Sequence, residues 1–396
     1  MHIKKAKNQI GVGGLILGRK EKEYLAKVIK SNRLSYGPFS KKIEQKFAKT
    51  HGARFGLFLN SGTSALQVAL GVLKEKYKWK DGDEVLVPAA TFIATTNIIL
   101  QNKLKPVFVD SDSTTYNIDP SLIERKITKR TRCIIPVHLF GLPCDMGPIM
   151  RIAKKHDLRV LEDSCETMFA THNGKSVGSF GDIACFSTYV AHLIVTGVGG
   201  FSLTNNKDLA IAMRSAMNHG RDNIYISIDD DKDKKGKGLL EVIKKRFSFV
   251  RMGYSYRNTE LEAAVGLAQL ESMRELMRRR RECAEFFKTE LADLSDEIQL
   301  PTTPRGRTHS FMMFPMLMKR GNKEKFVQFL EEHNIETRDM PTTLNQPYYK
   351  KLFGNILKEY PVCKRMVNRG FYIGCHPYIT RKEQKYVVGV IRSFFS

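Results

Sequence analysis

Long hydrophobic runs are absent from the 396-residue sequence. No stretch approaches the roughly 18 consecutive apolar residues that a membrane-spanning helix requires. The basic residues at the N-terminus are not followed by an apolar segment, which indicates that they are not a secretory signal. With a hydrophobic content of 42%, these absences predict a soluble, globular, cytoplasmic protein with no membrane partner.

Closely spaced cysteines are absent as well. The sequence contains seven cysteines, all ten or more residues apart and without a C-x-x-C pair: Cys133, Cys144, Cys165, Cys185, Cys283, Cys363 and Cys375. Zinc sites and iron–sulfur clusters are usually held by cysteines that lie close together in the sequence. We therefore predict no metal centre and expect reduced thiols, as in cytosolic proteins.

Acidic residues are few, 41 against 65 basic ones, and the formal net charge is +24. Such a charge suits nucleic acid, a membrane surface or a polyanionic substrate. The basic residues are nevertheless spread along the whole chain, with one tight cluster at 278–281. No zinc-finger, RNA-recognition or helix-turn-helix signature accompanies them. A solvated basic surface is therefore favoured, and nucleic acid stays an alternative partner.

Short apolar runs alternate with helix-like segments from about residue 56 onward. The runs at 84–89, 105–110, 133–140 and 158–163 are typical of buried strands. Their alternation with amphipathic segments predicts an α/β fold with a mainly parallel sheet covered by helices on both faces.

The second half of the chain shows two further features. A polar segment predicts a loop insertion at about 225–245. Thr259 and Glu262 then form a T-x-x-E capping box at the start of a long helix. We divide the chain into a large domain, residues 1–257, and a linking helix with a smaller C-terminal domain, residues 258–396.

The segment NSGTSAL, residues 60–66, lies where a strand-like run turns into a helix. Backbone N–H groups of Gly62, Thr63 and Ser64 at this positive helix end are suited to binding a phosphate. Taken alone, the same residues are also typical of an ordinary helix cap.

Two later segments carry further candidates. Asp163 ends a buried strand-like run, at the edge where open α/β sheets bind ligands, although a carboxylate there can be structural. Ser187 ends the next strand-like run, and His192 follows five residues later. A lone histidine is more often a structural residue than a catalytic one.

The order of these segments resembles the DegT family of sugar aminotransferases that depend on pyridoxal phosphate (PLP). Matching segments include LNSGTSALQVAL, VPAATFIATTNII, KPVFVDSDSTTYNIDP, LEDSCE, GYSYRNTELEAAVGLAQL and YPVCKR, and they extend over nearly the whole chain. The resemblance implies the fold type I architecture of PLP-dependent transferases, with a mainly parallel seven-stranded sheet and a smaller α+β domain. It also implies a homodimer in which both subunits line each site.

The resemblance assigns cofactor contacts to eight residues: Gly62, Thr63, Ser64, Phe92, Asp163, Glu166, Ser187 and Ser255. The 62–64 turn and Ser187 would bind the cofactor phosphate. Phe92 would stack on the pyridine ring, and Asp163 would pair with the ring nitrogen. Most members have a glutamine near the phenolic oxygen where Glu166 stands. Ser255 replaces an asparagine that usually reaches the phosphate of the neighbouring subunit.

No lysine stands between Lys175 and Lys207, where the family keeps the residue that binds PLP covalently. His192 occupies that position, 29 residues after Asp163, and Val198 replaces the glutamate of the family's G-E-G-G. One branch of the family, the GDP-4-keto-6-deoxymannose 3-dehydratases, carries the same exchange. Its histidine acts as a base with pyridoxamine phosphate (PMP) bound to a 4-keto sugar, from which the 3-hydroxyl group leaves.

This resemblance predicts an enzyme of deoxysugar and polysaccharide biosynthesis that binds PLP or PMP noncovalently. We expect His192 to be catalytic, the substrate to be a nucleotide-linked keto sugar, the amino donor to be a compound such as glutamate, and the reaction to be 3-dehydration rather than transamination. Two alternatives stay open. One is a PLP-dependent reaction on another anionic substrate, such as a nucleotide or a modified nucleic-acid base. The other is a family descendant without catalytic activity.

Overall fold

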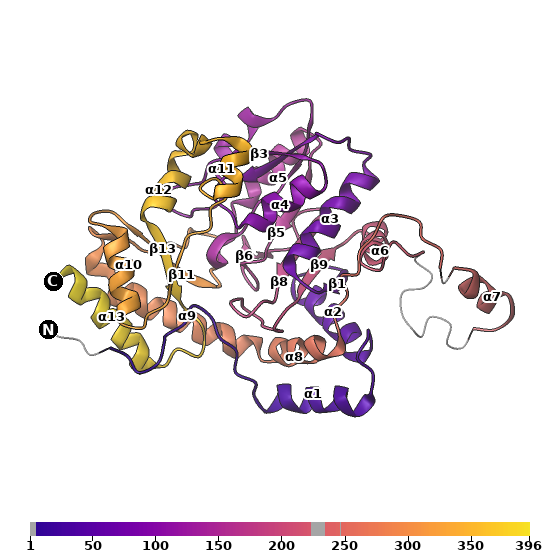
Figure 1. The fold of residues 1–396 in the computed structure, drawn as a ribbon, viewed down its shortest axis with the longest axis horizontal. Helices are drawn as coiled ribbons and strands as arrows, with labels where there is room; N and C mark the ends of the chain where they lie inside the picture. Colours follow the sequence, from indigo (N-terminus) through magenta and orange to yellow (C-terminus); the bar gives the residue numbers. More distant parts are fainter. Residues whose placement is uncertain (1–4, 223–233, 246) are drawn as a thin grey trace.

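The computed structural model describes residues 5–222, 234–245 and 247–396. Its centre is a seven-stranded sheet with the strand order β1-β9-β8-β5-β4-β2-β3 (Figure 1). The strands are β1 (Phe55–Leu59), β2 (Glu84–Pro88), β3 (Lys105–Val109), β4 (Thr131–Ile134), β5 (Arg159–Asp163), β8 (Ile183–Ser187) and β9 (Gly200–Thr204). Only β9 runs in the direction opposite to the other six strands of this sheet. The predicted mainly parallel sheet is therefore confirmed.

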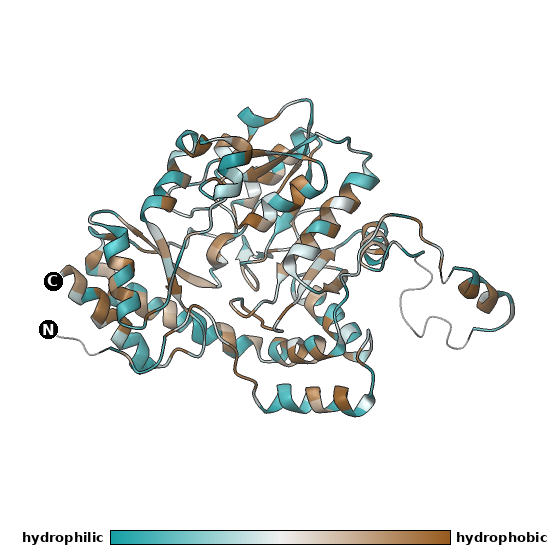
Figure 2. Ribbon diagram, in the orientation of Figure 1, coloured by the Kyte–Doolittle hydropathy of each residue, from teal (hydrophilic) through white to brown (hydrophobic). Residues whose placement is uncertain are grey.

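Helices cover both faces of this sheet, because its strands are apolar along their length. Every residue of β2, β8 and β9 is buried, and Figure 2 shows hydrophobic strands at the centre with mixed helices around them. Helix α3 packs against both α4 and α6, while α2 packs on β1 and contacts α8. The helices up to the linking segment are α1 (Arg19–Ser31), α2 (Pro38–Thr50), α3 (Gly62–Lys76), α4 (Ile93–Gln101), α5 (Met146–Lys155), α6 (Lys207–Ala216), α7 (Gly236–Lys245), α8 (Glu260–Glu271) and α9 (Met273–Glu290). A two-stranded sheet, β6 (Thr171–His172) and β7 (Lys175–Ser176), lies outside the main sheet.

The C-terminal part forms a second hydrophobic core around a four-stranded antiparallel sheet, which we call the small domain. Its strands are β10 (Ile298–Gln299), β11 (Met313–Met318), β12 (Thr337–Asp339) and β13 (Gly370–Gly374). Its helices are α10 (Lys323–Glu332), α11 (Pro347–Phe353), α12 (Pro361–Arg369) and α13 (Arg381–Phe395). Phe287 of α9, Phe314 of β11 and Phe326 of α10 are fully buried together in this core. The predicted fold class is confirmed by this α+β arrangement.

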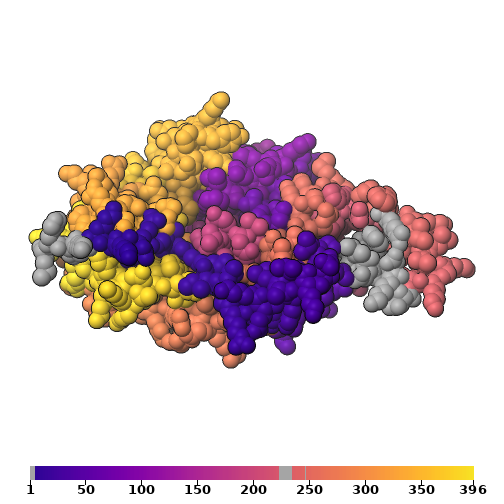
Figure 3. All heavy atoms as spheres, turned by 60° about the horizontal axis from the view of Figure 1, so that its bottom comes forward, coloured from indigo at the N-terminus to yellow at the C-terminus, as the bar shows by residue number. Residues whose placement is uncertain are grey.

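The N-terminal segment joins the small domain rather than the large sheet. Ile10 forms a β-bridge with Ile335 and belongs to the small domain's core. Two residues later, the backbone N–H of Val12 donates to Glu336 Oε2 at 2.7 Å. Figure 3 shows this first part of the chain lying along the C-terminal segments. The small domain therefore contains residues from both ends of the sequence.

The linking segment and the insertion differ from the sequence prediction. Thr259 and Glu262 form the predicted capping box, but the helix that they open ends at Glu271, and α9 begins two residues later. Residues 225–233 of the predicted loop insertion lie outside the described residues. The prediction of a loop is wrong for Gly236–Lys245, which form α7, a helix that projects from the body in Figure 1. Leu239, Val242 and Ile243 recur there at helical spacing, which the surrounding charges obscured.

None of the helices that the structure describes is long and apolar enough to cross a lipid bilayer.

Candidate active site

A cavity of about 610 Å³ lies at the carboxyl ends of the central strands, where β5, β8 and the N-termini of α3 and α4 converge. This is the edge at which open α/β sheets bind ligands, and the volume suits a cofactor-sized molecule. The structure brings seven of the nine predicted site residues to its wall: Gly62, Thr63, Phe92, Asp163, Glu166, Ser187 and His192.

The turn that opens α3 is shaped for an anion. Ser61 caps the helix, and its Oγ accepts the N–H of Ser64 at 3.0 Å, so Ser64 itself is buried beneath the wall. Among the described residues, no group accepts a hydrogen bond from the backbone N–H groups of Gly62 and Thr63. These two donors, at the positive end of a 15-residue helix, are therefore available to an anionic ligand.

Gly62 allows the helix to approach the end of β8. A Cβ atom at this position would lie 2.7 Å from Ser187 Cβ and 2.8 Å from Cys165 Sγ. Both distances are shorter than a Cβ atom normally keeps from another heavy atom. Only glycine thus brings the helix N-terminus and the Ser187 hydroxyl to one place. Two backbone donors and a hydroxyl form a donor set that fits a phosphate group.

Asp163 carries a carboxylate at the floor of the cavity and is only 3% exposed. Its Oδ2 accepts from Thr95 Oγ1 at 2.7 Å, and its Oδ1 accepts the backbone N–H of Cys165 at 3.1 Å. Burial raises the pKa of this carboxyl group, and the two hydrogen bonds oppose the rise. Each oxygen keeps a second lone pair, so the carboxylate can still accept a hydrogen bond from a ligand's cationic N–H group.

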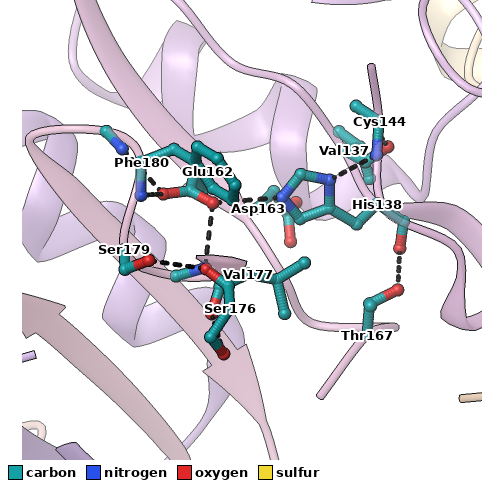
Figure 4. A network of polar contacts seen from close by, with 12 residues as sticks. Val137, His138, Cys144, Glu162, Asp163, Thr167, Ser176, Val177, Ser179 and Phe180 are labelled. Atoms are coloured by element: carbon teal, nitrogen blue, oxygen red, sulfur yellow. Dashed lines mark hydrogen bonds and ion pairs between the residues drawn. The ribbon is translucent and has the colours of Figure 1, made fainter. Parts of the chain in front are cut away.

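Glu162 precedes Asp163 in β5, and strand alternation directs its side chain to the opposite face of the sheet. From there it holds the end of the strand in place (Figure 4). Its carboxylate accepts the backbone N–H groups of Gly178, Phe180 and Gly181 at 2.7–2.9 Å. The fully buried His138 ring contacts it through Nε2 at 3.3 Å and accepts the Cys144 N–H at Nδ1.

These contacts define the protonation of the pair. Because Nδ1 of His138 accepts the Cys144 N–H, Nε2 carries the proton that is donated to Glu162. Burial opposes ionisation of Glu162, but the His138 and backbone hydrogen bonds outweigh it and lower the pKa of the carboxyl group. The end of β5 is therefore held firmly, and Asp163 with it.

Glu166 lines the cavity three residues beyond Asp163. Its Oε2 accepts the backbone N–H of Phe140 at 2.9 Å, and Phe140 is in the left-handed region with φ 57°. Burial raises the pKa of Glu166 to about 7. A substantial fraction of this side chain is therefore protonated at neutral pH, so it can donate as well as accept, as a glutamine amide does.

His192 lies in the loop between β8 and β9, and its half-buried ring lines the cavity. Hydrogen bonds between Thr188 and Thr196 close the base of this loop, including one of 2.6 Å between their hydroxyls. The ring's Nδ1 lies 3.2 Å from the carbonyl oxygen of Tyr189. A carbonyl can only accept, so Nδ1 carries the proton and Nε2 is the nitrogen that can take one.

The pKa of His192 is set by its surroundings. Burial lowers it most, the Tyr189 carbonyl opposes this, and the positive charge of Arg280 lowers it further. The imidazole is therefore neutral at physiological pH, the state that a general base needs.

Two predicted residues do not line this cavity. Ser64 lies beneath it, as described above. Ser255 is paired with Asn218 by a β-bridge, and its Oγ accepts from Arg257 Nη2 at 2.7 Å. The resemblance assigned Ser255 to the neighbouring subunit's site, so that assignment stays a prediction.

Other lining residues were missed by the sequence analysis. Glu336, Arg338 and Tyr372 reach the cavity from the small domain, and Val12 from the N-terminal segment. Their sequence positions carry no strand-end or helix-start signal that points to a ligand. Thr95 could have been inferred, because it lies in the first turn of a helix that follows a buried strand.

The full sequence matches the model of the DegT/DnrJ/EryC1/StrS aminotransferase family over residues 16–392. The chain belongs to this family. The family member GDP-perosamine synthase of Escherichia coli O157:H7 is 33% identical over 95% of the chain and 96% of its own length. The lipopolysaccharide biosynthesis protein of Salmonella typhimurium is also 33% identical, over 96% of the chain and 91% of its own length. Both similarities extend over at least 95% of the chain.

Solved structures extend this similarity. The Escherichia coli GDP-4-keto-6-deoxy-D-mannose-3-dehydratase with bound hydrated PLP is 26% identical and superposes with a TM-score of 0.85 over 99% of the chain and 100% of its own. A histidine-to-asparagine variant of a GDP-4-keto-6-deoxymannose-3-dehydratase with bound GDP-perosamine gives the same TM-score over 97% of the chain and 100% of its own. The Helicobacter pylori aminotransferase of pseudoaminic acid biosynthesis, 22% identical with a TM-score of 0.87 over 98% of the chain and 99% of its own, shares the fold.

Proposed function

We propose that the protein binds PLP or PMP noncovalently and removes the 3-hydroxyl group of a nucleotide-linked 4-keto sugar, with His192 as the proton-transferring base. The observation that carries this proposal is that His192 lines the same cavity as Asp163, whereas no lysine is among the described residues on its wall. An imidazole forms no stable imine with PLP but transfers protons well near neutral pH.

The residues of the cavity fit the cofactor. The Gly62 and Thr63 N–H groups and the Ser187 hydroxyl would hold its phosphate, and Asp163 would pair with its ring nitrogen. Phe92, whose side chain is 59% exposed at the start of α4, offers a flat face to the ring. When bound, the cofactor supplies an electron sink for charge that develops on the substrate.

His192 would act through Nε2. With Nδ1 bound to the Tyr189 carbonyl, only Nε2 can accept a proton, and the imidazolium so formed can return one to the leaving hydroxyl. One residue can therefore serve both the removal of a proton and the departure of the 3-hydroxyl as water. Glu166 would donate to the cofactor's phenolic oxygen, because its raised pKa keeps it partly protonated.

The remaining parts of the proposal concern partners. A nucleotide sugar is favoured because a similar 3-dehydratase has been solved with GDP-perosamine. An amino donor such as glutamate would supply the amino group of PMP. We further propose a homodimer in which Ser255 faces the partner's cofactor phosphate, and a division into domains at residues 257 and 258.

Replacement of His192 tests this function. His192→Asn keeps the size and polarity of the side chain but removes the base. We expect cofactor binding to persist while turnover of GDP-4-keto-6-deoxymannose with PMP and glutamate falls by about 10²–10⁴-fold, the usual contribution of a positioned acid–base group. Full activity in His192→Asn would mean that the histidine is a bystander.

A second substitution, His192→Lys, tests whether the cofactor is bound covalently, and the product of the wild-type enzyme distinguishes dehydration from transamination. Borohydride treatment of the wild-type protein should leave no cofactor on the chain, whereas His192→Lys should yield a trapped adduct and a shifted absorbance band. Covalent label on any lysine of the wild-type protein would contradict the proposal. Amino-sugar product from the wild-type enzyme would instead favour transamination.

A further inference from the structure

Arg280 differs from its neighbours in the arginine cluster 278–281. Arg278 and Arg279 are exposed and form ion pairs with Glu275 on the surface of α9. Arg280 points inward and is only 3% exposed. A buried guanidinium is costly to desolvate, so its partners should reveal what it does.

Four backbone carbonyls surround this guanidinium. Nη1 donates to Phe311 at 3.1 Å, to Met312 at 2.7 Å and to Cys375 at 3.2 Å, and Nη2 donates to His192 at 3.4 Å. Phe311 and Met312 precede β11, and Cys375 follows β13, so these three carbonyls belong to the small domain. The fourth belongs to the residue proposed as the base. The Arg280 side chain thus joins the His192 loop to the small domain.

The charge of Arg280 is not neutralised. Among the described residues, no carboxylate forms an ion pair with it, in contrast to Arg278 and Arg279. Carbonyl oxygens satisfy its N–H groups but leave a full positive charge behind the His192 loop. If packing alone were needed, a neutral side chain would be less costly at this position.

This charge acts on a ring with few other charges behind it. The titratable and charged groups that share the cavity wall with His192 are Asp163, Cys165, Glu166, Tyr189, Glu336, Arg338 and Tyr372. Arg280 approaches from the other side, through α9. After burial, it is the group that most disfavours a proton on His192, and it acts in the same direction on His376 of the small domain.

We propose that Arg280 is a positioning residue for the proton-transfer site, which ties the His192 loop to the small domain and places a positive charge behind the imidazole. The inference rests on the proposed role of His192. Arg280 contacts the loop backbone rather than the cavity, so its effect passes through His192. A neutral, fixed imidazole is ready to accept a proton at Nε2.

Three variants of the full-length protein separate the two effects of Arg280. Arg280→Gln removes both the charge and the hydrogen-bond fork, while Arg280→Lys keeps the charge but cannot reach four carbonyls. The matched control is Arg281→Gln, which removes a charge from the next, exposed position of α9. Proton NMR of histidine-labelled protein, with the His192 signal identified by its loss in His192→Asn, follows the ring between pH 5 and pH 8.

The charge predicts different titrations in these variants. His192 should stay neutral down to pH 5 in the wild type, in Arg280→Lys and in Arg281→Gln. In Arg280→Gln protonation should begin at a higher pH than in these three proteins, because the pKa of His192 rises once the positive charge is removed, although burial still holds it below the ordinary value near 6.5. An unchanged titration in Arg280→Gln, or an equal shift in both Arg280 variants, would overturn the electrostatic role.

Hydrogen exchange tests the tie to the small domain. Amides of the loop 188–199 should exchange faster in both Arg280 variants than in the wild type and in Arg281→Gln. Wild-type exchange in a folded Arg280→Lys would overturn the positioning role, and this variant decides the matter if Arg280→Gln does not fold. Neither measurement uses turnover, so failure of the dehydratase proposal in His192→Asn remains a separate result.

Discussion

Asp163 combines a fixed position with a spare hydrogen-bonding capacity. Thr95 and the Cys165 N–H hold its two oxygens in place, and Glu162 secures the strand from behind. A carboxylate held in this way can stabilise a protonated ring nitrogen without moving. The residue is therefore suited to keep a bound PLP ring cationic.

Asp163→Asn should separate this electronic role from a structural one. The amide has the same shape and retains a hydrogen-bonding oxygen, so the fold should persist and some cofactor should still bind. Turnover should fall by about 10²-fold or more, because the ring nitrogen loses its ionic partner. Stopped-flow turnover beside a cofactor titration measures both. Thr95→Ser, which retains the hydroxyl donor, is the control and should stay near wild-type activity.

Unchanged turnover in Asp163→Asn, with normal cofactor affinity, would show that the carboxylate only supports the strand.

Local sequence signals identified one side of the site and missed the other. Gly62, Asp163 and Ser187 could be found because each stands where a strand ends or a helix begins. Glu336 and Arg338 could not, because β12 reaches the cavity only through packing of the small domain. The state of His192 was equally hidden, since it depends on the Tyr189 carbonyl and on Arg280.

At the scale of elements, a residue that follows one strand caps the N-terminus of the distant helix α12. Pro361 begins the helix and has no N–H group, and the next two N–H groups, of Val362 and Cys363, donate to Asp110 at 3.0 Å. Asp110 follows β3 of the large sheet. The matching segment YPVCKR had no physical explanation in the sequence, and this contact supplies one.

Asp110→Ala should weaken the packing of α12 on the core of the large sheet. It leaves two N–H groups of a helix N-terminus without their acceptor, and we expect a loss of about 1–3 kcal/mol in the free energy of unfolding. The urea midpoint of the protein, measured at one fixed cofactor concentration, reports the loss. Asp208→Ala, which removes an exposed carboxylate of α6, should change it by less than about 0.5 kcal/mol.

A midpoint for Asp110→Ala equal to that of Asp208→Ala would mean that solvent satisfies the α12 N-terminus instead.

The helices and strands were largely predictable from the sequence, but the side of a helix that is buried was not. The capping box at Thr259 is a purely local signal and was found correctly. The interruption at Ser272 shifts the buried face, so that Met277 is buried and Leu276 only partly buried. Such a break reflects packing against both cores, which no window of local sequence contains.

At the scale of the whole molecule, a group of exposed apolar side chains is relevant to the proposed homodimer. Phe247, Phe249, Val250 and Met252 follow α7 and are 52–89% exposed. Soluble monomers rarely leave such a group of side chains in water. The family resemblance implies a homodimer, and this segment is our candidate for part of its interface.

Light scattering at micromolar concentration and physiological salt should therefore give twice the chain mass of 45.2 kDa. Met252→Asp should shift the protein toward the monomer, because it places a charge in the expected apolar contact. Arg281→Asp, a charge change of the same sign on exposed α9, is the control and should stay dimeric. A wild-type protein that scatters as a monomer would contradict the interface and the proposed role of Ser255.

The contact between Val12 and Glu336 also determines when the cavity wall is completed during biosynthesis. The two residues are 324 positions apart in the sequence. A ribosome adds about 5–20 residues per second, so Val12 leaves the peptidyl-transferase centre tens of seconds before its acceptor is made. The large sheet with Asp163 and His192 is synthesised within that interval, while the N-terminal segment has no partner strand. The cavity wall therefore closes only after the chain has been synthesised beyond Glu336.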